Sequence, residues 1–526
     1  MSRSVARLQV FPAADGNPQH VGTRSLQTID NVLCSLFEHA RPTVKEISEW
    51  ASDRKGFGLA WVLLEFIKTG RALLPLERLD LSDFSLGAGK LTCLFSSLPE
   101  GPHFVETLRC SPHVCKDKSL SVLLSFFERL KGGGTGGGTS ICLKTLDLSK
   151  CDLDDIADVM FLLLPRSVEH LDLSGNRLRT PSMTVLSSVL ALDRLPHLLS
   201  FDLSDNPLGP SGLRALSRGL SSPTQVLHLQ SLKLARTKVR EEGVETLAEA
   251  LKARKTTSLQ TLDLEGNDMR AGGLKQLASA VNEEAVPHLR VLTLKENKLT
   301  RLRSNEVDFA PLAEFLSTSA LKELEELDLS DNPLYVGGNE GDFAFAAALL
   351  VPGRFPKLRR LNLGGFPMHS GQVEVFATAL GVEGAPSFEE LVLSHAGEGE
   401  SSEGIVALAN ALGSGHQSQL RAFRMHHRGD ILREAFVGFS GSLGAGKNPN
   451  LRSLELFVLS RGDGSEFSGG VSAMAEVIRE GGLSSLENFR LNIFVRSTDG
   501  AALASLGEAL GGGGCPSLQK LDFALE

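Results

Sequence analysis

Residues 171–178 read LDLSGNRL, and residues 201–208 repeat the pattern as FDLSDNPL. Further copies read LDLEGNDM (262–269), LTLKENKL (292–299) and LDLSDNPL (327–334). In each copy, leucine or another apolar residue alternates with polar residues and an asparagine follows, which is typical of a short strand that ends in a turn. The sequence therefore contains one structural unit in several copies.

Weaker copies of the leading L-x-x-L-x-L segment extend the pattern in both directions. Fifteen copies begin between Leu76 and Leu518, and from Val168 onward they start 30 to 35 residues apart. Between the strands, segments such as 241–253 and 401–413 carry apolar residues at helical spacing. A strand and a helix in each unit predict a repeat solenoid, because the apolar face of one unit is buried only against its neighbours.

The unit length, the L-x-x-L-x-L-x-x-N-x-L signature and the amphipathic helix resemble the ribonuclease-inhibitor subclass of leucine-rich repeats, over residues 76–526. That subclass includes cytosolic ribonuclease inhibitors, Ran GTPase activators and the sensor arms of nucleotide-binding immune receptors. The resemblance implies an α/β fold, a right-handed horseshoe solenoid of about 15 repeats. Since parallel strands stack ~4.8 Å apart and helices need ~8–10 Å, the parallel sheet should form the concave face and the helices the convex face.

Two stretches depart from the repeat. Before its first copy we predict a flexible N-terminal tail at 1–19 and a helical N-terminal cap at 20–72. The leucine-rich-repeat domain then covers 73–526. Within it, GGGTGGG at 132–138 is predicted to be a flexible insertion. The repeats after about residue 366 are predicted to be divergent, because the asparagine of the signature is lost there.

The asparagine of the signature is predicted to have a structural role. It follows the strand, where its amide can satisfy backbone groups of stacked turns. Cys151 and Thr237 replace it in two units, and Phe366 and Ala396 stand at its position later in the chain. The predicted structural Asn ladder consists of Asn176, Asn206, Asn267, Asn297 and Asn332.

The residue between the second and third leucine of each unit should point to the concave face, since strand side chains alternate. Aspartate predominates at this position, as Asp80, Asp147, Asp172, Asp202, Asp263 and Asp328. Near 420–430 the column changes, and the residues expected to face inward are Arg421, Arg424, His426 and His427. We predict a wall that is acidic first and mixed to basic near 420–430, and that binds a protein partner with a basic patch. The alternative is that these aspartates belong to a common form of the repeat sequence, are exposed to solvent and bind no partner.

The composition narrows the classes of function. A formal net charge of −9 argues against a nucleic-acid binder, which usually needs a basic face. No apolar run approaches the ~18 residues of a membrane span, so we predict no membrane association. Seven cysteines in 526 residues indicate a reducing compartment. We predict a monomeric, cytoplasmic protein, with the nucleus as an alternative location and mitochondria less favoured.

Two motifs resemble chemical sites but lack a required part. GSLGAGKN at 441–448 resembles a phosphate-binding loop, but Asn448 replaces the hydroxyl residue and a strand follows instead of a helix. CSPHVC supplies too few ligands for structural zinc, so Cys110 and Cys115 are predicted to be buried thiols. We therefore predict no catalytic residues, no cofactor and no metal.

The leading hypothesis is a non-catalytic intracellular scaffold that binds a protein partner on its concave face. The resemblance to Ran activators gives the alternative, a GTPase-activating regulator of a Ran-type small GTPase. Minor alternatives are an orphan immune-type sensor and a ribonuclease-inhibitor-like inhibitor. A predicted concave face without Trp or Tyr and the low cysteine count differ from the tight ribonuclease inhibitors.

Overall fold

The computed structural model describes residues 78–82, 87–97, 105–131, 142–154, 157–224, 226–303, 306–308, 310–332, 348–383, 387–396, 403–429, 433–444, 447–459, 465–494 and 500–525. The predicted tail at 1–19, the predicted cap at 20–72 and the glycine-rich segment at 132–138 lie outside these residues. The chain divides into two compact units, Met1–Asn206 and Pro207–Glu526.

The first unit alternates short parallel strands with helices. Its strands are hydrogen-bonded in chain order, and each buries its middle residue while the residues on either side face the opposite surface. The strands are β1 (Arg78–Asp80), β2 (Thr107–Arg109), β3 (Thr145–Asp147), β4 (His170–Asp172) and β5 (Ser200–Asp202). The helices are α5 (Ala88–Ser97), α6 (Asp117–Lys131), α7 (Ala157–Leu163) and α8 (Thr180–Ala191).

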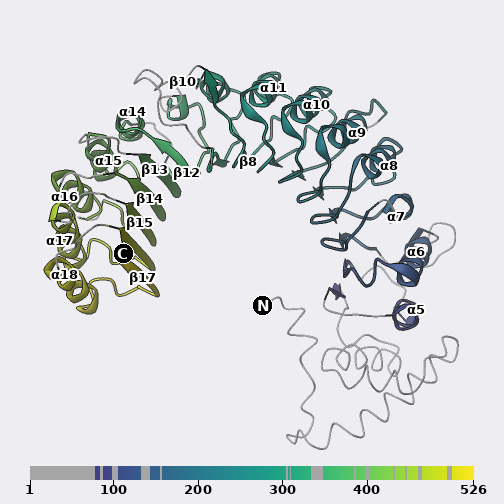
Figure 1. The fold of residues 1–526 in the computed structure, drawn as a ribbon, viewed down its shortest axis with the longest axis horizontal. Helices are drawn as coiled ribbons and strands as arrows, with labels where there is room; N and C mark the ends of the chain where they lie inside the picture. Colours follow the sequence, from purple (N-terminus) through teal and green to yellow (C-terminus); the bar gives the residue numbers. More distant parts are fainter. Residues whose placement is uncertain are drawn as a thin grey trace, which may run out of the picture. The chain divides into compact units, whose positions relative to one another are not determined.

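The second unit continues the alternation, with the strands on its inner side and the helices on its outer side (Figure 1). Its parallel strands are β6 (Ser231–Lys233), β7 (Thr261–Asp263), β8 (Val291–Thr293), β11 (Glu326–Asp328), β12 (Arg360–Met368), β13 (Glu390–Ala396), β14 (Ala422–Arg428), β15 (Ser453–Leu459), β16 (Asn488–Phe494) and β17 (Lys520–Leu525). Its helices are α9 (Gly209–Leu220), α10 (Arg240–Lys252), α11 (Arg270–Asn282), α12 (Ala310–Leu316), α14 (Ser370–Leu380), α15 (Glu403–Gly413), α16 (Arg433–Ser442), α17 (Ser465–Arg479) and α18 (Gly500–Gly511). A separate antiparallel pair joins β9 (Arg301–Arg303) and β10 (Glu306–Asp308).

The predicted α/β leucine-rich-repeat solenoid is confirmed. Among the described residues, 15 parallel strands correspond to the 15 copies of the repeat. The signature leucines are buried between the sheet and the helices; Leu262, Leu264 and Leu292 are each 0% exposed. Each repeat thus buries its apolar face against the next one, as the spacing requires.

The strands of the second unit change in length at β12. The strands β6, β7, β8 and β11 have three residues, whereas β13 to β16 have seven and β12 has nine. In the repeats of β7, β8 and β11, an asparagine follows the third leucine where the chain turns away, and in the repeat of β6 Thr237 stands there and donates through Oγ1 to the carbonyl oxygen of Leu234. Where Phe366, Ala396 or Arg428 occupies that position, the chain stays extended and pairs with its neighbours for more residues. The longer strands add rows of side chains to the strand side.

Close helix packing in these repeats depends on glycine. A Cβ atom at Gly404, the second residue of α15, would lie 2.6 Å from the carbonyl oxygen of Ser370 at the start of α14. Only a residue without a side chain allows this approach. The two helices therefore meet closely at their first turns.

Candidate functional site

The predicted acidic column lies on the strand side of the first unit. Asp147, Asp172 and Asp202 end β3, β4 and β5 and lie in register with one another. In each, Oδ1 accepts the backbone N–H two residues later, at N···O distances of 2.9 to 3.0 Å. This side-chain bond closes the turn after the strand. These aspartates therefore have a structural role that neither interpretation of the sequence included.

The charges of this column are unevenly compensated. Arg109 follows Asp80 in the register, and its guanidinium lies 3.0 Å from Asp147 and 3.9 Å from Asp80. Asp172 instead lies between two carboxylates, those of Asp147 and Asp202. Burial raises the pKa of Asp172, and the charges of Asp202 and Asp147 add to this effect. Asp172 thus has an unfavourable charge interaction with the carboxylates on both sides of it.

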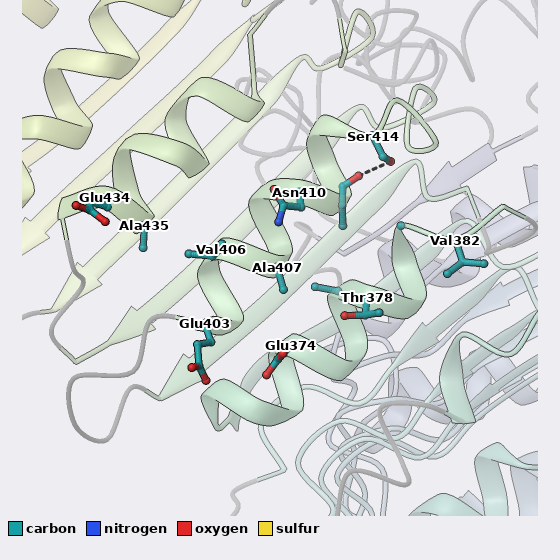
Figure 2. Close-up of a pocket in the computed structure, with 13 residues that line it drawn as sticks. Glu374, Thr378, Val382, Glu403, Val406, Ala407, Asn410, Ser414, Glu434 and Ala435 are labelled. Atoms are coloured by element: carbon teal, nitrogen blue, oxygen red, sulfur yellow. Dashed lines mark hydrogen bonds between the residues drawn. The ribbon is translucent and has the colours of Figure 1, made fainter.

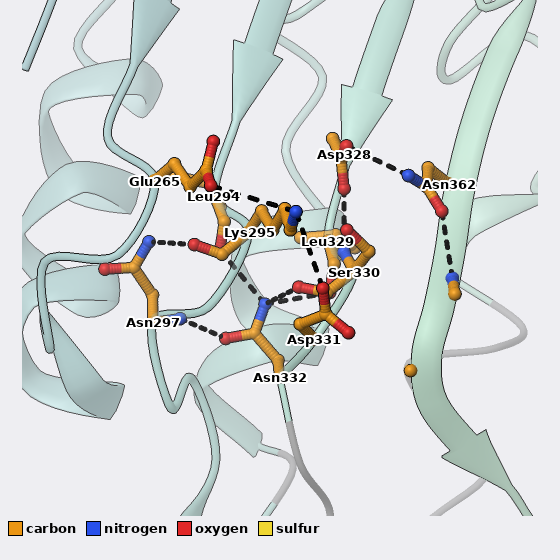
Figure 3. Close-up of polar contacts among 12 residues, drawn as sticks. Glu265, Leu294, Lys295, Asn297, Asp328, Leu329, Ser330, Asp331, Asn332 and Asn362 are labelled. Atoms are coloured by element: carbon orange, nitrogen blue, oxygen red, sulfur yellow. Dashed lines mark hydrogen bonds and ion pairs between the residues drawn. The ribbon is translucent and has the colours of Figure 1, made fainter. Parts of the chain in front are cut away.

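The second unit carries the same turn-closing aspartates. Asp263 accepts the backbone N–H of Glu265 at 3.0 Å, and Asp328 accepts that of Ser330 at 2.8 Å. Figure 3 shows that Asp328 also receives a hydrogen bond from Nδ2 of Asn362 on β12, at 3.0 Å. The residue at this position of the repeat therefore changes from a carboxylate, Asp328, to an amide, Asn362, where the strands become longer.

The asparagines predicted as a ladder are buried and join successive repeats. Asn332 donates through Nδ2 to the carbonyl oxygens of Leu294 and Leu329, at 3.0 and 2.8 Å, while its Oδ1 accepts the backbone N–H of Asn297 at 2.8 Å (Figure 3). Asn267 repeats these contacts, and Asn297 donates to the carbonyl oxygens of Leu264 and Lys295 and accepts the N–H of Asn267. In the first unit, Asn206 donates to two carbonyl oxygens at 2.9 Å, and Asn176 makes equivalent bonds. These amides are occupied by backbone groups, so they offer nothing to a partner.

Cysteine replaces the ladder asparagine in the repeat of β3. Cys110 and Cys115 are buried as predicted, and Cys151 is buried with them. Hydrogen bonding to the neighbouring Cys110 thiol raises the pKa of Cys115, and hydrogen bonding to Cys115 raises that of Cys151, with burial adding to both. A high thiol pKa leaves little reactive thiolate at neutral pH.

The residues predicted as a basic region form a paired ladder across β14 to β17. Arg424 makes two bonds of 2.9 Å to the carboxylate of Glu455. Arg490 contacts Glu455 at 3.4 Å and Asp522 at 2.8 Å. The hydrogen bonds between Arg424 and Glu455 raise the pKa of the arginine and lower that of the glutamate. The charges in this column alternate and compensate one another.

Two other residues of this region occupy different places. Arg421 lies just before β14, in a flanking row where its guanidinium is 3.9 Å from Glu389. The prediction that His427 faces inward is wrong, because His427 points into the core and is 1% exposed. Adjacent residues of a strand point to opposite faces, so the expected position of His426 requires the opposite one for His427.

The rings of His426, Phe457 and Phe494 lie side by side on the strand side of β14, β15 and β16. The ring centroids of His426 and Phe457 are 5.6 Å apart, and those of Phe457 and Phe494 are 5.1 Å apart. Leu459 is 38% exposed beside them. We call His426, Phe457, Phe494 and Leu459 the aromatic patch. Arg428, the residue that ends β14, is exposed on the same face of that strand.

Sequence reasoning identified His426 but missed Phe494 and Leu459 as parts of one surface. Both residues lie beyond the third leucine of the signature in their repeats. The signal was present in SLELFVL (453–459) and NFRLNIF (488–494), where the alternation of buried and half-buried residues continues to the end of each strand.

The segment that resembles a phosphate-binding loop is used for packing. Lys447 donates through Nζ to the carbonyl oxygen of Gly413 at 2.6 Å, and the Asn448 side chain is buried and donates to that of Ser442 at 3.3 Å. Both contacts hold the segment against the ends of α15 and α16.

Comparisons with known proteins point to one repeat class. A family model described as a leucine-rich repeat matches residues 139–156, 194–217 and 255–278. A Tonsoku-like protein of Bos taurus is 37% identical over 92 residues, which are 18% of this chain and 7% of that protein. The ribonuclease inhibitor of Sus scrofa is 34% identical over 118 residues, 22% of this chain and 25% of that protein. The chain thus matches a quarter or less of either relative.

A solved structure of the yeast Rad7–Elc1 complex contains a chain that aligns with 65% of this chain and 76% of its own length, at 16% identity and a TM-score of 0.36. Within the described part of the chain, no helix combines the length and apolar character needed to cross a membrane. Leucine-rich repeats of this type are typical of non-catalytic proteins that bind other proteins. The repeat signature, the alternating strands and helices, the family-model matches and the similarity to the porcine inhibitor together support a ribonuclease-inhibitor-like leucine-rich-repeat protein.

Proposed function

We propose that this protein is a non-catalytic scaffold that binds a protein partner on its strand side, with the aromatic patch as the principal contact. The observation that carries the proposal is the row of half-buried rings His426, Phe457 and Phe494 on three adjacent strands. Aromatic side chains supply a large contact area for a small loss of conformational freedom, and they are frequent in the energetic centres of protein interfaces.

The patch is supported by a rigid base. Residues 422–428 of β14 pair in register with 453–459 of β15, and those pair with 488–494 of β16. The sheet therefore fixes the ring positions before a partner arrives, which lowers the ordering cost of binding. The compensated ladder of Arg424, Glu455 and Arg490 forms a polar border along one side.

The chemistry of the patch defines the partner that fits it. A protruding aliphatic or aromatic side chain would cover Phe457 and Phe494, and a nearby carboxylate would meet Arg428. In the first unit, Asp172, which lies between two carboxylates, supports a separate contact with a basic group of a partner. The buried thiols of Cys110 and Cys115 support a reducing location such as the cytoplasm or nucleus.

The test is affinity capture from native cell lysate, followed by binding measurements with the purified partner. Phe457→Ala and Phe494→Ala should each weaken binding about tenfold or more, the effect of losing an interfacial anchor. Leu192→Ala is the matched control, because Leu192 is 70% exposed and follows α8 on the helix side. A partner that binds both phenylalanine variants like wild type would contradict the proposal. Stimulated GTP hydrolysis by a purified Ran-type GTPase would instead support the regulator alternative.

A further inference from the structure

The helix side of the second unit carries a groove that the strand-side proposal does not use. It lies over α14, α15 and α16 and has a volume of about 700 Å³ (Figure 2). A second hollow of about 410 Å³ continues from it between α15 and α16, and the two share Val406 and Asn410. They form one depression, which we call the helix-side groove.

The helix-side groove combines small and aliphatic residues with the polar side chains of Thr378, Asn410 and Ser414. Small residues, Ala377 and Gly381 from the α14 repeat and Ala407 from α15, line it and leave room above the helix backbones. Val382 and Val406, which also line it, are 50% and 45% exposed. Exposed aliphatic side chains beside a hollow are typical of a surface that another protein covers.

The two ends of the groove differ in charge. Glu374, Glu403 and Glu434 come from the first half of three successive helices, and Figure 2 shows them at one end of the groove. Lys447 lines the continuation near the last residues of α15 and α16. A ligand that fits this distribution is apolar in the middle and basic at the end that meets the glutamates.

We propose that the helix-side groove binds an amphipathic helical segment of a partner protein. The segment presents small or aliphatic side chains at positions i, i+3 or i+4 and i+7, and Lys or Arg at the end next to Glu374 and Glu403. The 11 residues of α15 span about 16 Å as a helix, which corresponds to about three turns of the bound segment. Because the groove lies on the helix side over α14, α15 and α16 and the aromatic patch lies on the strand side of β14, β15 and β16, one protein can hold two partners.

The probe is a displayed library of 14-residue helical peptides with randomised apolar positions and Lys, Glu or Ser at the flanking positions. We expect wild-type protein to enrich peptides with a basic end. Ala407→Leu fills the groove from a half-exposed position and should weaken the enriched peptides about tenfold or more. The double change Glu374→Lys with Glu434→Lys should weaken them similarly, and added salt should weaken wild-type binding.

The matched control reverses the same number of charges elsewhere. Glu242→Lys with Glu245→Lys alters two exposed positions of α10 and should leave peptide affinity unchanged. Far-UV circular dichroism of every variant checks that it is folded, and Ala407→Leu keeps the test valid if a charge reversal unfolds. Phe457→Ala should retain peptide binding, so this proposal and the strand-side function can fail separately.

Three results would overturn the inference. The first is a library that yields no enrichment, and the second is enrichment of acidic ends. The third is self-association of the wild type in sedimentation that Ala407→Leu abolishes, because the groove would then hold a second copy of this chain.

Discussion

The Nδ1 atom of His395 lies 2.7 Å from the Nδ1 atom of His427, and both side chains are buried. His427 contacts the carbonyl oxygen of Gly429 through Nε2 at 2.9 Å, so Nε2 carries the proton and Nδ1 accepts one from His395. The Nε2 atom of His395 has no hydrogen-bond partner among the described residues. The pair is therefore built for two neutral imidazoles.

This pair should make the second unit sensitive to acid. Burial, with smaller contributions from His427 and His369, lowers the pKa of His395 from 6.5 to about 3. Between these two pKa values, His395 binds a proton in the unfolded state but not in the folded state. The folded state therefore keeps its full stability above pH 6.5 and loses stability as the pH falls below 6.5. The loss should approach about 1.4 kcal/mol for each pH unit below 6.5.

Denaturant unfolding of wild type and His395→Gln between pH 7.5 and 4.5 measures this effect. The variant should lose less stability on acidification than wild type. His288→Gln, at an exposed position, is the control and should follow wild type. Parallel pH profiles for wild type and His395→Gln would exclude the histidine pair as the origin of the acid sensitivity.

We expect each buried asparagine of the ladder to contribute the energy of several hydrogen bonds to the free energy of unfolding. Asn297 donates to the carbonyl oxygens of Leu264 and Lys295 and accepts the N–H of Asn267, all in a buried turn. Asn297→Ala leaves these backbone groups without partners and should lower the free energy of unfolding by about 3 kcal/mol. Asn450→Ala, which removes one exposed bond to Ser418, should cost less than about 1 kcal/mol. Similar losses for both variants in urea titrations would refute the ladder's role.

Asp172 allows charge and turn geometry to be separated. Asp172→Asn keeps an oxygen that can accept the N–H of Ser174 and removes a charge from between Asp147 and Asp202, so stability at pH 7 should be unchanged or raised. Asp172→Ala removes the bond and should cost about 1 kcal/mol.

The pH dependence of Asp172 follows from its raised pKa. The folded state keeps the proton on Asp172 to a higher pH than the unfolded state does. This carboxyl therefore contributes most to the free energy of unfolding at low pH. Its contribution declines as the pH rises above 3.8. Urea titrations of the Asp172→Asn protein and wild type should therefore diverge as the pH rises through this window. A constant difference would show that the neighbouring carboxylates do not interact with Asp172.

The thiols of Cys115 and Cys151 should resist alkylation. Their raised pKa values and burial keep them protonated and covered, whereas Cys142 is only half-buried. Native protein treated with iodoacetamide at pH 7.5 and mapped by mass spectrometry should carry the label on Cys142 before Cys115 and Cys151. Labelling of Cys151 at the rate of Cys142 would contradict the buried arrangement.

The repeat spacing was sufficient to predict the fold, because a strand and a helix in every unit leave one way to bury the leucines. The two-residue period also predicted that Asp147, Asp172 and Asp202 share a face. It did not predict their bonds to the following turns, because turn geometry depends on backbone angles that the leucine pattern does not contain. The pairing of Arg424 with Glu455 was accessible from the alternating charges of the column.

Other features of the site needed the three-dimensional structure. The loss of asparagine at Phe366 indicates divergence, but it does not say that the strand will continue and expose Phe494 on a common surface. The helix-side groove depends on how closely α14 and α15 approach, which is determined by the absence of a side chain at Gly404 and the packing below it. Spacing within one helix contains no information about this distance.

The direction of the asparagine bonds determines how disruption spreads through the second unit. Asn332 receives the N–H of Asn297, and Asn297 receives that of Asn267, so each repeat completes the turn of the one before it. Removing a later link therefore exposes the earlier turn, and the three repeats open together as one cooperative block. The repeats after β12 are joined by longer strands instead, so their turns do not depend on this series of asparagine bonds. Amide hydrogen exchange should show a step in protection close to Asn332.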